Sequence, residues 1–273
     1  MTPDPLSPSE NPAIEVEALE KRYGGVAAVR AISFRLARGE VLGLLGGNGA
    51  GKTTTIGMIM GLVLPSGGRV SVFGTDMAKD RYRVLHRMNF ESPYVDMPHR
   101  LTVRQNLEVF GRLYGVDRIK ARITDLAREL HLEAFLDRES GALSAGQKTR
   151  VALAKSLINE PDLLLLDEPT ASLDPDTADW VRTRLETYRK ARGASILLAS
   201  HNMAEVERLC DRVIIMKAGA IADEGTPQNL IEKYGRHSLE EVFLDVARTG
   251  EARCPYCGTA YRLKPGSTPR AHH

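Results

Sequence analysis

Apolar and polar positions divide the chain into strand-like and helix-like segments. Apolar residues that alternate or run together predict strands at residues 14–19, 31–36, 41–45, 69–73, 163–166, 195–199 and 212–216. Apolar residues at every third or fourth position predict helices at residues 103–114 and 119–132. Nearly continuous apolar strands that alternate with helices favour a mostly parallel sheet covered on both faces. The pattern therefore predicts an α/β fold with an N-terminal antiparallel β subdomain and an inserted helical subdomain at about residues 88–160.

A glycine-rich segment follows the strand predicted at residues 41–45. It consists of Gly46, Gly47, Asn48, Gly49, Ala50, Gly51, Lys52 and Thr53, with Thr54 next in the chain. This order matches the phosphate-binding loop, in which glycines let backbone N–H groups turn inward around phosphate oxygens. The helix expected after the loop adds a dipole that favours phosphate. The segment therefore predicts a nucleotide site, with Lys52 on the β and γ phosphates and Thr53 on Mg²⁺.

Two adjacent acids, Asp167 and Glu168, follow the run of leucines at residues 163–166. Ligands bind outside the carboxyl ends of parallel strands, so this position places both carboxylates at the predicted site. We expect Asp167 to hold Mg²⁺ and Glu168 to orient the water that attacks the γ phosphate. The alternative is a surface acid pair that begins a turn before Pro169, but it leaves the buried run of leucines unexplained.

A helix start is predicted at Ser144, with Gln147 at the third helical position. This spacing is a capping box, in which each side chain accepts from the other residue's backbone N–H. Two interpretations stay open at this point. The segment is a well-capped helix start, or it is a second anion site where the hydroxyl and the bare Gly146 approach a phosphate.

Composition narrows the class of protein. The chain has 273 residues, of which 42% are hydrophobic and 26% charged, with a net charge of +2, so no bias toward nucleic acid is present. The longest nearly apolar run, residues 56–64, is far shorter than the roughly 20 residues of a membrane span. Three cysteines without a secretory segment favour the cytoplasm, and the Pro-rich residues 1–12 are expected to be a disordered leader.

Several motifs, in order, resemble those of the nucleotide-binding subunits of ABC transporters. Residues 46–53 are similar to their Walker A loop, residues 143–147 (LSAGQ) to their signature, and residues 163–168 to their Walker B strand with its catalytic glutamate. Residues 171–174 resemble the D-loop, which ends at Asp174, and Ser200-His201 resembles the switch histidine. Tyr23 resembles the aromatic residue that stacks on adenine, although a tyrosine in a turn is by itself more often plain surface. The resemblance covers residues 14–246, and we take the ATP-binding domain as residues 13–248.

The resemblance implies an ATPase that works as a homodimer or heterodimer. Two subunits face each other head to tail in this family, so Ser144, Gly146 and Gln147 are expected to contact the γ phosphate held by the partner's loop. Glu168 is then the base and His201 contacts the γ phosphate, and MgATP is the ligand. A separately encoded membrane permease is the expected partner, with transport in the export direction, at the inner face of the cell membrane.

Two departures from the family pattern stand out. Gly47 replaces the usual proline of the loop, which makes the loop more flexible without removing a donor. The usual glutamine after the strand near Phe90 is absent, so Glu91 or Ser92 substitutes for it or the coupling to the membrane partner differs. The alternative function is a soluble ATP-driven switch that acts as a regulator or scaffold, and Glu168 argues against it.

The tail, residues 249–273, lies beyond the resemblance and contains Cys254 and Cys257. A C-x-x-C pair resembles one half of a zinc site, and tetrahedral zinc needs four ligands, so two tails in a dimer would complete it. The alternative is a disordered tail with two free thiols. The third cysteine, Cys210, lies in an apolar stretch and is expected in the core.

Overall fold

A six-stranded sheet forms the centre of the molecule. The computed structural model describes residues 11–92, 96–171, 173–246, 251–253 and 260–262. The strand order in this sheet is β10-β9-β3-β8-β7-β6. All neighbouring pairs are parallel except β9 and β10, which form an antiparallel hairpin. The strands are β3 (Val41–Leu45), β6 (Met88–Glu91), β7 (Leu163–Asp167), β8 (Ser195–Ser200), β9 (Arg212–Lys217) and β10 (Ala220–Gly225).

A second, antiparallel sheet is built largely from the N-terminal part of the chain. Its strand order is β2-β1-β4-β5. The strands are β1 (Ile14–Tyr23), β2 (Val26–Leu36), β4 (Gly67–Val72) and β5 (Thr75–Asp76). β1 and β2 extend to a tight turn at Gly24 and are longer than the alternation of residues predicts. A short hairpin of β11 (Glu251–Arg253) and β12 (Ala260–Arg262) forms a separate sheet.

The central strands are apolar on both faces because both faces are covered. Leu164 and Leu166 of β7 pack into the apolar cluster on the side of most helices. Leu163 and Leu165 pack into a second cluster, which includes residues of the antiparallel sheet and of α1. Side chains alternate between the faces of a strand, so a run of leucines fills both clusters at once. This arrangement is the physical reason for the near-continuous apolar runs in the sequence.

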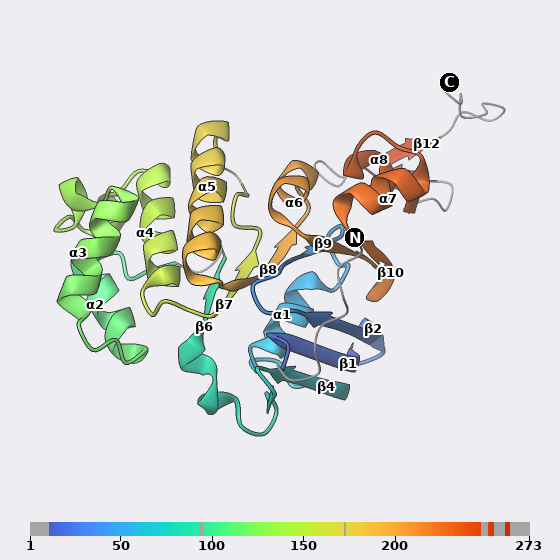
Figure 1. The fold of residues 1–273 in the computed structure, drawn as a ribbon, viewed down its shortest axis with the longest axis horizontal. Coiled ribbons are helices and arrows are strands. Elements are labelled where there is room, and N and C mark those ends of the chain that lie inside the picture. Colours follow the sequence, from blue (N-terminus) through green and yellow to red (C-terminus); the bar gives the residue numbers. More distant parts are fainter. Residues whose placement is uncertain (1–10, 93–95, 172, 247–250, 254–259, 263–273) are drawn as a thin grey trace.

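Helices pack around the central sheet, and three of them form a separate group at one end of the molecule (Figure 1). The helices are α1 (Lys52–Ile59), α2 (Val103–Leu113), α3 (Ile119–Leu130), α4 (Ala145–Leu157), α5 (Pro175–Arg192), α6 (Met203–Leu209), α7 (Pro227–Tyr234) and α8 (Leu239–Val246). Figure 1 shows α2, α3 and α4 together at one end of the molecule, away from β1, β2 and β4. Strand β6 of the central sheet, Met88–Glu91, is the strand that the sequence analysis places near Phe90. In the described ranges, no helix has the length and apolar content that crossing a membrane requires.

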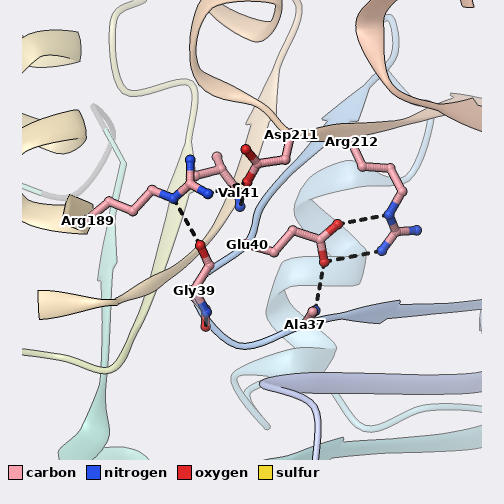
Figure 2. A network of polar contacts seen from close by, with 8 residues as sticks. Ala37, Gly39, Glu40, Val41, Arg189, Asp211 and Arg212 are labelled. Carbon is pink, nitrogen blue, oxygen red and sulfur yellow. Dashed lines mark hydrogen bonds and ion pairs between the residues drawn. The ribbon is translucent and has the colours of Figure 1, made fainter. Parts of the chain in front are cut away.

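A polar network joins the amino ends of the central strands to α5 (Figure 2). Asp211 accepts hydrogen bonds from the Val41 N–H at 2.8 Å and from Arg189 at 2.6 Å. Glu40 accepts from Arg212 at 2.9 Å. These pairs hold β3, β9 and α5 in register at the edge opposite to the carboxyl ends of the strands. Cys210, immediately before the network, is buried as expected, and its burial raises the pKa of the thiol.

Candidate nucleotide site

The carboxyl ends of three central strands converge on one cavity. β3 leads into the glycine-rich loop of residues 46–53, which we call the phosphate loop. β7 ends at Asp167, directly before Glu168, and β8 ends directly before His201. The cavity has a volume of about 330 Å³ and is lined by Gly47, Asn48, Gly49, Ala50, Gly51, Lys52, Thr53, Thr54, Asp167, Glu168 and His201. Segments far apart in the sequence therefore meet at one edge of the sheet, where ligands of such folds bind.

Close packing dictates the glycines at the two ends of the phosphate loop. Gly51 has a φ of +101°, and a Cβ there would lie 2.7 Å from the carbonyl oxygen of Ala28. A Cβ at Gly46 would lie 2.8 Å from the carbonyl oxygen of Met216. Gly47 has open space around it, so no contact there requires a glycine in place of the family's usual proline. The loop is thus held against β2 and β9 by contacts that a side chain would disrupt.

Lys52, which is buried, and the partly buried Glu168 and His201 form a polar cluster in the lining of the cavity. The Lys52 ammonium donates to the carbonyl oxygen of Gly46 at 2.6 Å and lies 3.5 Å from Oε1 of Glu168. The other carboxylate oxygen of Glu168 lies 2.6 Å from Nδ1 of His201. Glu168 also has a left-handed backbone, with a φ of 58°, and its N–H donates to Ala199 of β8. The Glu168 carboxylate therefore contacts both of the other predicted catalytic side chains.

Asp167 and Thr53 have an arrangement that fits Mg²⁺. The Thr53 hydroxyl donates to one carboxylate oxygen of Asp167 at 2.8 Å. The other oxygen, Oδ1, is buried without a hydrogen-bond partner. Burial raises the pKa of Asp167, and the neighbouring charge of Glu168 adds to the effect. An orphaned buried carboxylate oxygen beside a hydroxyl is the kind of hard oxygen donor set that Mg²⁺ prefers.

The start of α4 has the predicted capping box. The Ser144 hydroxyl accepts from the Gln147 N–H at 3.3 Å, and the Gln147 side chain accepts from the Ser144 N–H at 3.1 Å. Asp174 similarly caps α5 by accepting from the Thr177 N–H at 3.0 Å. Among the described residues, Ser144, Gly146, Gln147 and Asp174 stand apart from the lining of the cavity. One copy of the chain therefore does not bring the two predicted anion sites together.

Tyr23 is the last residue of β1 and lies outside the turn in which the sequence places it. Its side chain is 51% exposed, and the Lys21 ammonium lies 4.9 Å from the ring centroid. Tyr23 does not line the cavity among the described residues. Its ring has an accessible surface for stacking, and the adenine contact stays a prediction.

The residues near the missing glutamine form a buried ion pair. Glu91, the last residue of β6, lies 2.8 Å from the Lys155 ammonium of α4, and both side chains are buried. Lys155 also donates to the carbonyl oxygen of Phe90 at 3.2 Å. Burial raises the pKa of Glu91, and Lys155 opposes the shift. The pair ties α4 to the central sheet, so the Glu91 carboxylate is engaged away from the cavity.

The sequence reasoning missed Glu205, a fully buried carboxylate in α6. Oε1 accepts from the Thr170 hydroxyl at 2.9 Å, and Oε2 accepts from the Ser200 hydroxyl at 2.7 Å. Burial raises its pKa, and both hydroxyl contacts oppose that shift. The spacing in the sequence could have indicated its burial. Glu205 lies four residues before Leu209, so both side chains fall on the same face of the short helix, which is the buried one.

The fold and the cavity define a phosphate-loop nucleoside triphosphatase with acidic residues at the ends of its central strands. A family model described as ABC transporter matches residues 29–171. The chain is 40% identical to the Nod factor export ATP-binding protein I of Rhizobium sp. (strain N33), over 85% of this chain and 76% of the relative. It is 39% identical to the protein of the same name from Ralstonia nicotianae, over 86% of this chain and 73% of the relative.

Solved structures agree with these relatives. The structure described as an ATP binding subunit of an ABC transporter has a TM-score of 0.79 and 30% identity, over 86% of this chain and all of that one. The cbiO1 protein from Clostridium perfringens has a TM-score of 0.73 and 31% identity, over 82% of this chain and 92% of that one. The chain belongs to the ABC transporter family, as one of its ATP-binding subunits. It is an ATPase, as the motifs predict.

The two tail cysteines, Cys254 and Cys257, lie outside the described residues. Within the described ranges, no group of histidine, cysteine and acidic side chains has the arrangement of a metal site. Zinc binding by the tail stays a prediction from the sequence, and metal analysis of the purified protein tests it.

Proposed function

We propose that this chain hydrolyses MgATP between two subunits that face each other head to tail and thereby drives solute export through a membrane permease. The observation that carries the proposal is the position of the Glu168 carboxylate. It lies in the phosphate-loop cavity, 3.5 Å from Lys52 and 2.6 Å from His201. A base, a cation and a histidine at the end of a buried strand are the groups that phosphoryl transfer to water needs.

In this mechanism the backbone N–H groups of the phosphate loop bind the phosphates, and Lys52 leaves the Gly46 carbonyl for the β and γ phosphates. Glu168, released from Lys52, accepts a hydrogen bond from the attacking water and orients it in line with the γ phosphate. His201 contacts the γ phosphate and holds the other carboxylate oxygen of Glu168. The γ-phosphoryl group passes to water, and the products are ADP and phosphate.

Asp167 and Thr53 would hold Mg²⁺ through the orphaned Oδ1 and the hydroxyl. The ion would neutralise charge on the β and γ phosphate oxygens. Both residues come from rigid elements, the end of β7 and the first turn of α1, so they are preorganised for this role.

The second half of each site comes from the other subunit in this proposal. Ser144, Gly146 and Gln147 begin α4, and Ser144 is exposed to solvent. They stand apart from the cavity of their own chain, as residues that act on a partner's γ phosphate must. ATP therefore joins the two subunits, and hydrolysis separates them and resets the permease.

The export direction rests on the relatives, whose names describe Nod factor export. The cbiO1 relative is described as part of an ABC transporter complex. By analogy, we place this chain at the inner face of the cell membrane, bound to a permease.

The test compares phosphate release by the wild type with that of a Glu168→Gln variant. We expect the wild type to release phosphate from MgATP and the variant to bind ATP, to lose hydrolysis and to accumulate an ATP-bound dimer. Size-exclusion chromatography with light scattering measures the dimer. If the wild type binds ATP but neither hydrolyses it nor dimerises, and adding the permease changes neither result, the data would instead support the ATP-driven switch.

A further inference from the structure

Glu205 bridges the two segments that carry Glu168 and His201. Thr170 lies two residues after Glu168, and its hydroxyl donates to Oε1 of Glu205 at 2.9 Å. Ser200 lies directly before His201, and its hydroxyl donates to Oε2 at 2.7 Å. All three side chains are buried, with Glu205 0% exposed. One carboxylate group thus contacts both segments without being part of the cavity lining.

The capping of α6 does not require this carboxylate. The Asn202 side chain caps the helix by accepting from the Glu205 N–H at 3.2 Å, so the cap uses only the backbone of Glu205. An apolar side chain would fill the same volume without the desolvation penalty of a buried acid. The contacts that do use the carboxylate are the two hydroxyls.

We propose that Glu205 is a positioning residue for ATP hydrolysis, which holds Glu168 and His201 in contact by accepting one hydrogen bond from each of their segments. The inference rests on the proposed function, because it assumes that the Glu168–His201 pair takes part in hydrolysis. Two separate acceptor oxygens are necessary for this role. A carboxylate has two acceptor oxygens, whereas an amide has only one.

Glu205→Gln is therefore the decisive variant. Its single carbonyl oxygen satisfies one hydroxyl, and its NH₂ group faces the other hydroxyl as a donor. We expect kcat to fall by about tenfold to a hundredfold, as for a displaced general base. We expect the KM for ATP to stay unchanged, and the ATP-bound dimer to accumulate, as we also expect for Glu168→Gln. A merely structural role would instead lower the melting temperature and weaken ATP binding together.

Glu207→Gln is the matched control, since Glu207 lies in the same helix, is exposed, and accepts a hydrogen bond from the Leu239 N–H of α8, which a glutamine oxygen can also accept. It should keep the wild-type kcat. Ser200→Ala and Thr170→Val each remove one hydroxyl and should each lower kcat. If each hydroxyl acts through Glu205, the same substitution should lower kcat less when it is made in the Glu205→Gln variant than in the wild type.

A readout that does not need activity is the imidazole ¹⁵N resonance of His201, assigned by its loss in His201→Gln. We expect this resonance to shift in Glu205→Gln and not in Glu207→Gln. A Glu205→Gln variant with wild-type kcat and an unshifted resonance overturns the inference. If the resonance shifts while the wild type itself hydrolyses no ATP, the proposed function fails but the positioning contact is real.

Discussion

The phosphate loop and the start of α4 are both helix N-termini with glycines, yet they are built in opposite ways. The N-cap of α1 is Gly51, which has no side chain to cap the helix, so the backbone donors there stay available to a ligand. α4 begins with a complete capping box, in which Ser144 and Gln147 satisfy each other's N–H groups. The first site is therefore incomplete without an anion, and the second is satisfied within its own chain.

The phosphate loop and the start of α4 also differ in how tightly their glycines are packed. Gly46 and Gly51 of the loop lie against β9 and β2, where a Cβ would contact backbone atoms at less than 3 Å. A Cβ at Gly146 would meet only the Thr177 hydroxyl, at 3.6 Å. The packing of its own chain thus constrains Gly51 and leaves Gly146 unconstrained. This difference is what the proposed head-to-tail dimer requires, in which each protomer supplies a phosphate cradle and one half of the partner's site.

Gly51→Ala should have the largest effect, because it tests the packed region. Alanine at a φ of +101° is strained, and its Cβ would lie 2.7 Å from the Ala28 carbonyl oxygen. We expect ATP affinity to fall by at least about a hundredfold, and the free energy of unfolding to fall by about 2 kcal/mol or more. Isothermal titration calorimetry and chemical denaturation measure the two. Gly47→Ala, in open space, is the control and should bind ATP normally.

Asp167→Asn should have the second largest effect. It should lower the rate of hydrolysis while it raises the stability of the nucleotide-free protein. The raised pKa of Asp167 means that its ionised form destabilises the fold, more so as the pH rises through the folded-state pKa. We expect Mg²⁺-dependent hydrolysis to fall about a hundredfold. Without nucleotide, the variant should melt above the wild type, and this gap should widen from acidic to neutral pH. A gap that narrows with rising pH would contradict the buried-charge account.

Gly146→Ala should have a smaller and more selective effect. The added Cβ fits beside Thr177, so folding and ATP binding by the monomer should match those of the wild type. We expect a weaker ATP-induced dimer and about tenfold slower hydrolysis, since the methyl group would lie where the partner's γ phosphate approaches. Light scattering and phosphate release check both. Weakened ATP binding by the monomer would show instead that α4 acts on the site of its own chain.

Arg150→Ala should have the smallest effect. The Arg150 guanidinium of α4 lies 4.6 Å from the ring centroid of Trp180 in α5, and Trp180 is the single tryptophan of the sequence. We expect a loss of about 0.5–1 kcal/mol in stability and a change in tryptophan emission, with ATP affinity unchanged. Arg184→Ala is the control, because Arg184 contacts the same ring from within α5 and its removal leaves the contact between α4 and α5 in place. Unaltered emission in Arg150→Ala would show that this contact is absent in solution.

Much of the candidate site followed from local sequence. The phosphate loop, the acids after the apolar run of β7 and the capping box of α4 are each recognisable within a few residues, because each depends on neighbouring backbone groups. The near-continuous apolar runs of β7 and β8 predicted a parallel sheet with two covered faces, and the two apolar clusters agree with it. The resemblance to a family then assigned roles to His201 and Asp174, whose local sequence is ambiguous.

The contacts between distant segments did not follow. Glu91 and Lys155 are 64 positions apart in the sequence (155 minus 91), and nothing near either residue predicts their buried ion pair. The neighbour of the strand near Phe90 did not follow either, since only the folded chain shows that residues 88–91 pair with β7 at the edge of the central sheet. Strand pairing depends on which edge of the sheet is free, and a local pattern does not contain that information.

The sequence by itself determined which backbone segments can bind phosphate, begin a helix or fill a two-sided sheet, because these properties arise from residues within one or two turns of each other. Only the tertiary structure decided that Lys52, Glu168 and His201 are in contact and that Glu205 braces two of their segments. Burial makes the hydrogen bonds and charge of a carboxylate matter to the free energy of the folded chain, and that burial is created by elements that are far apart in the sequence.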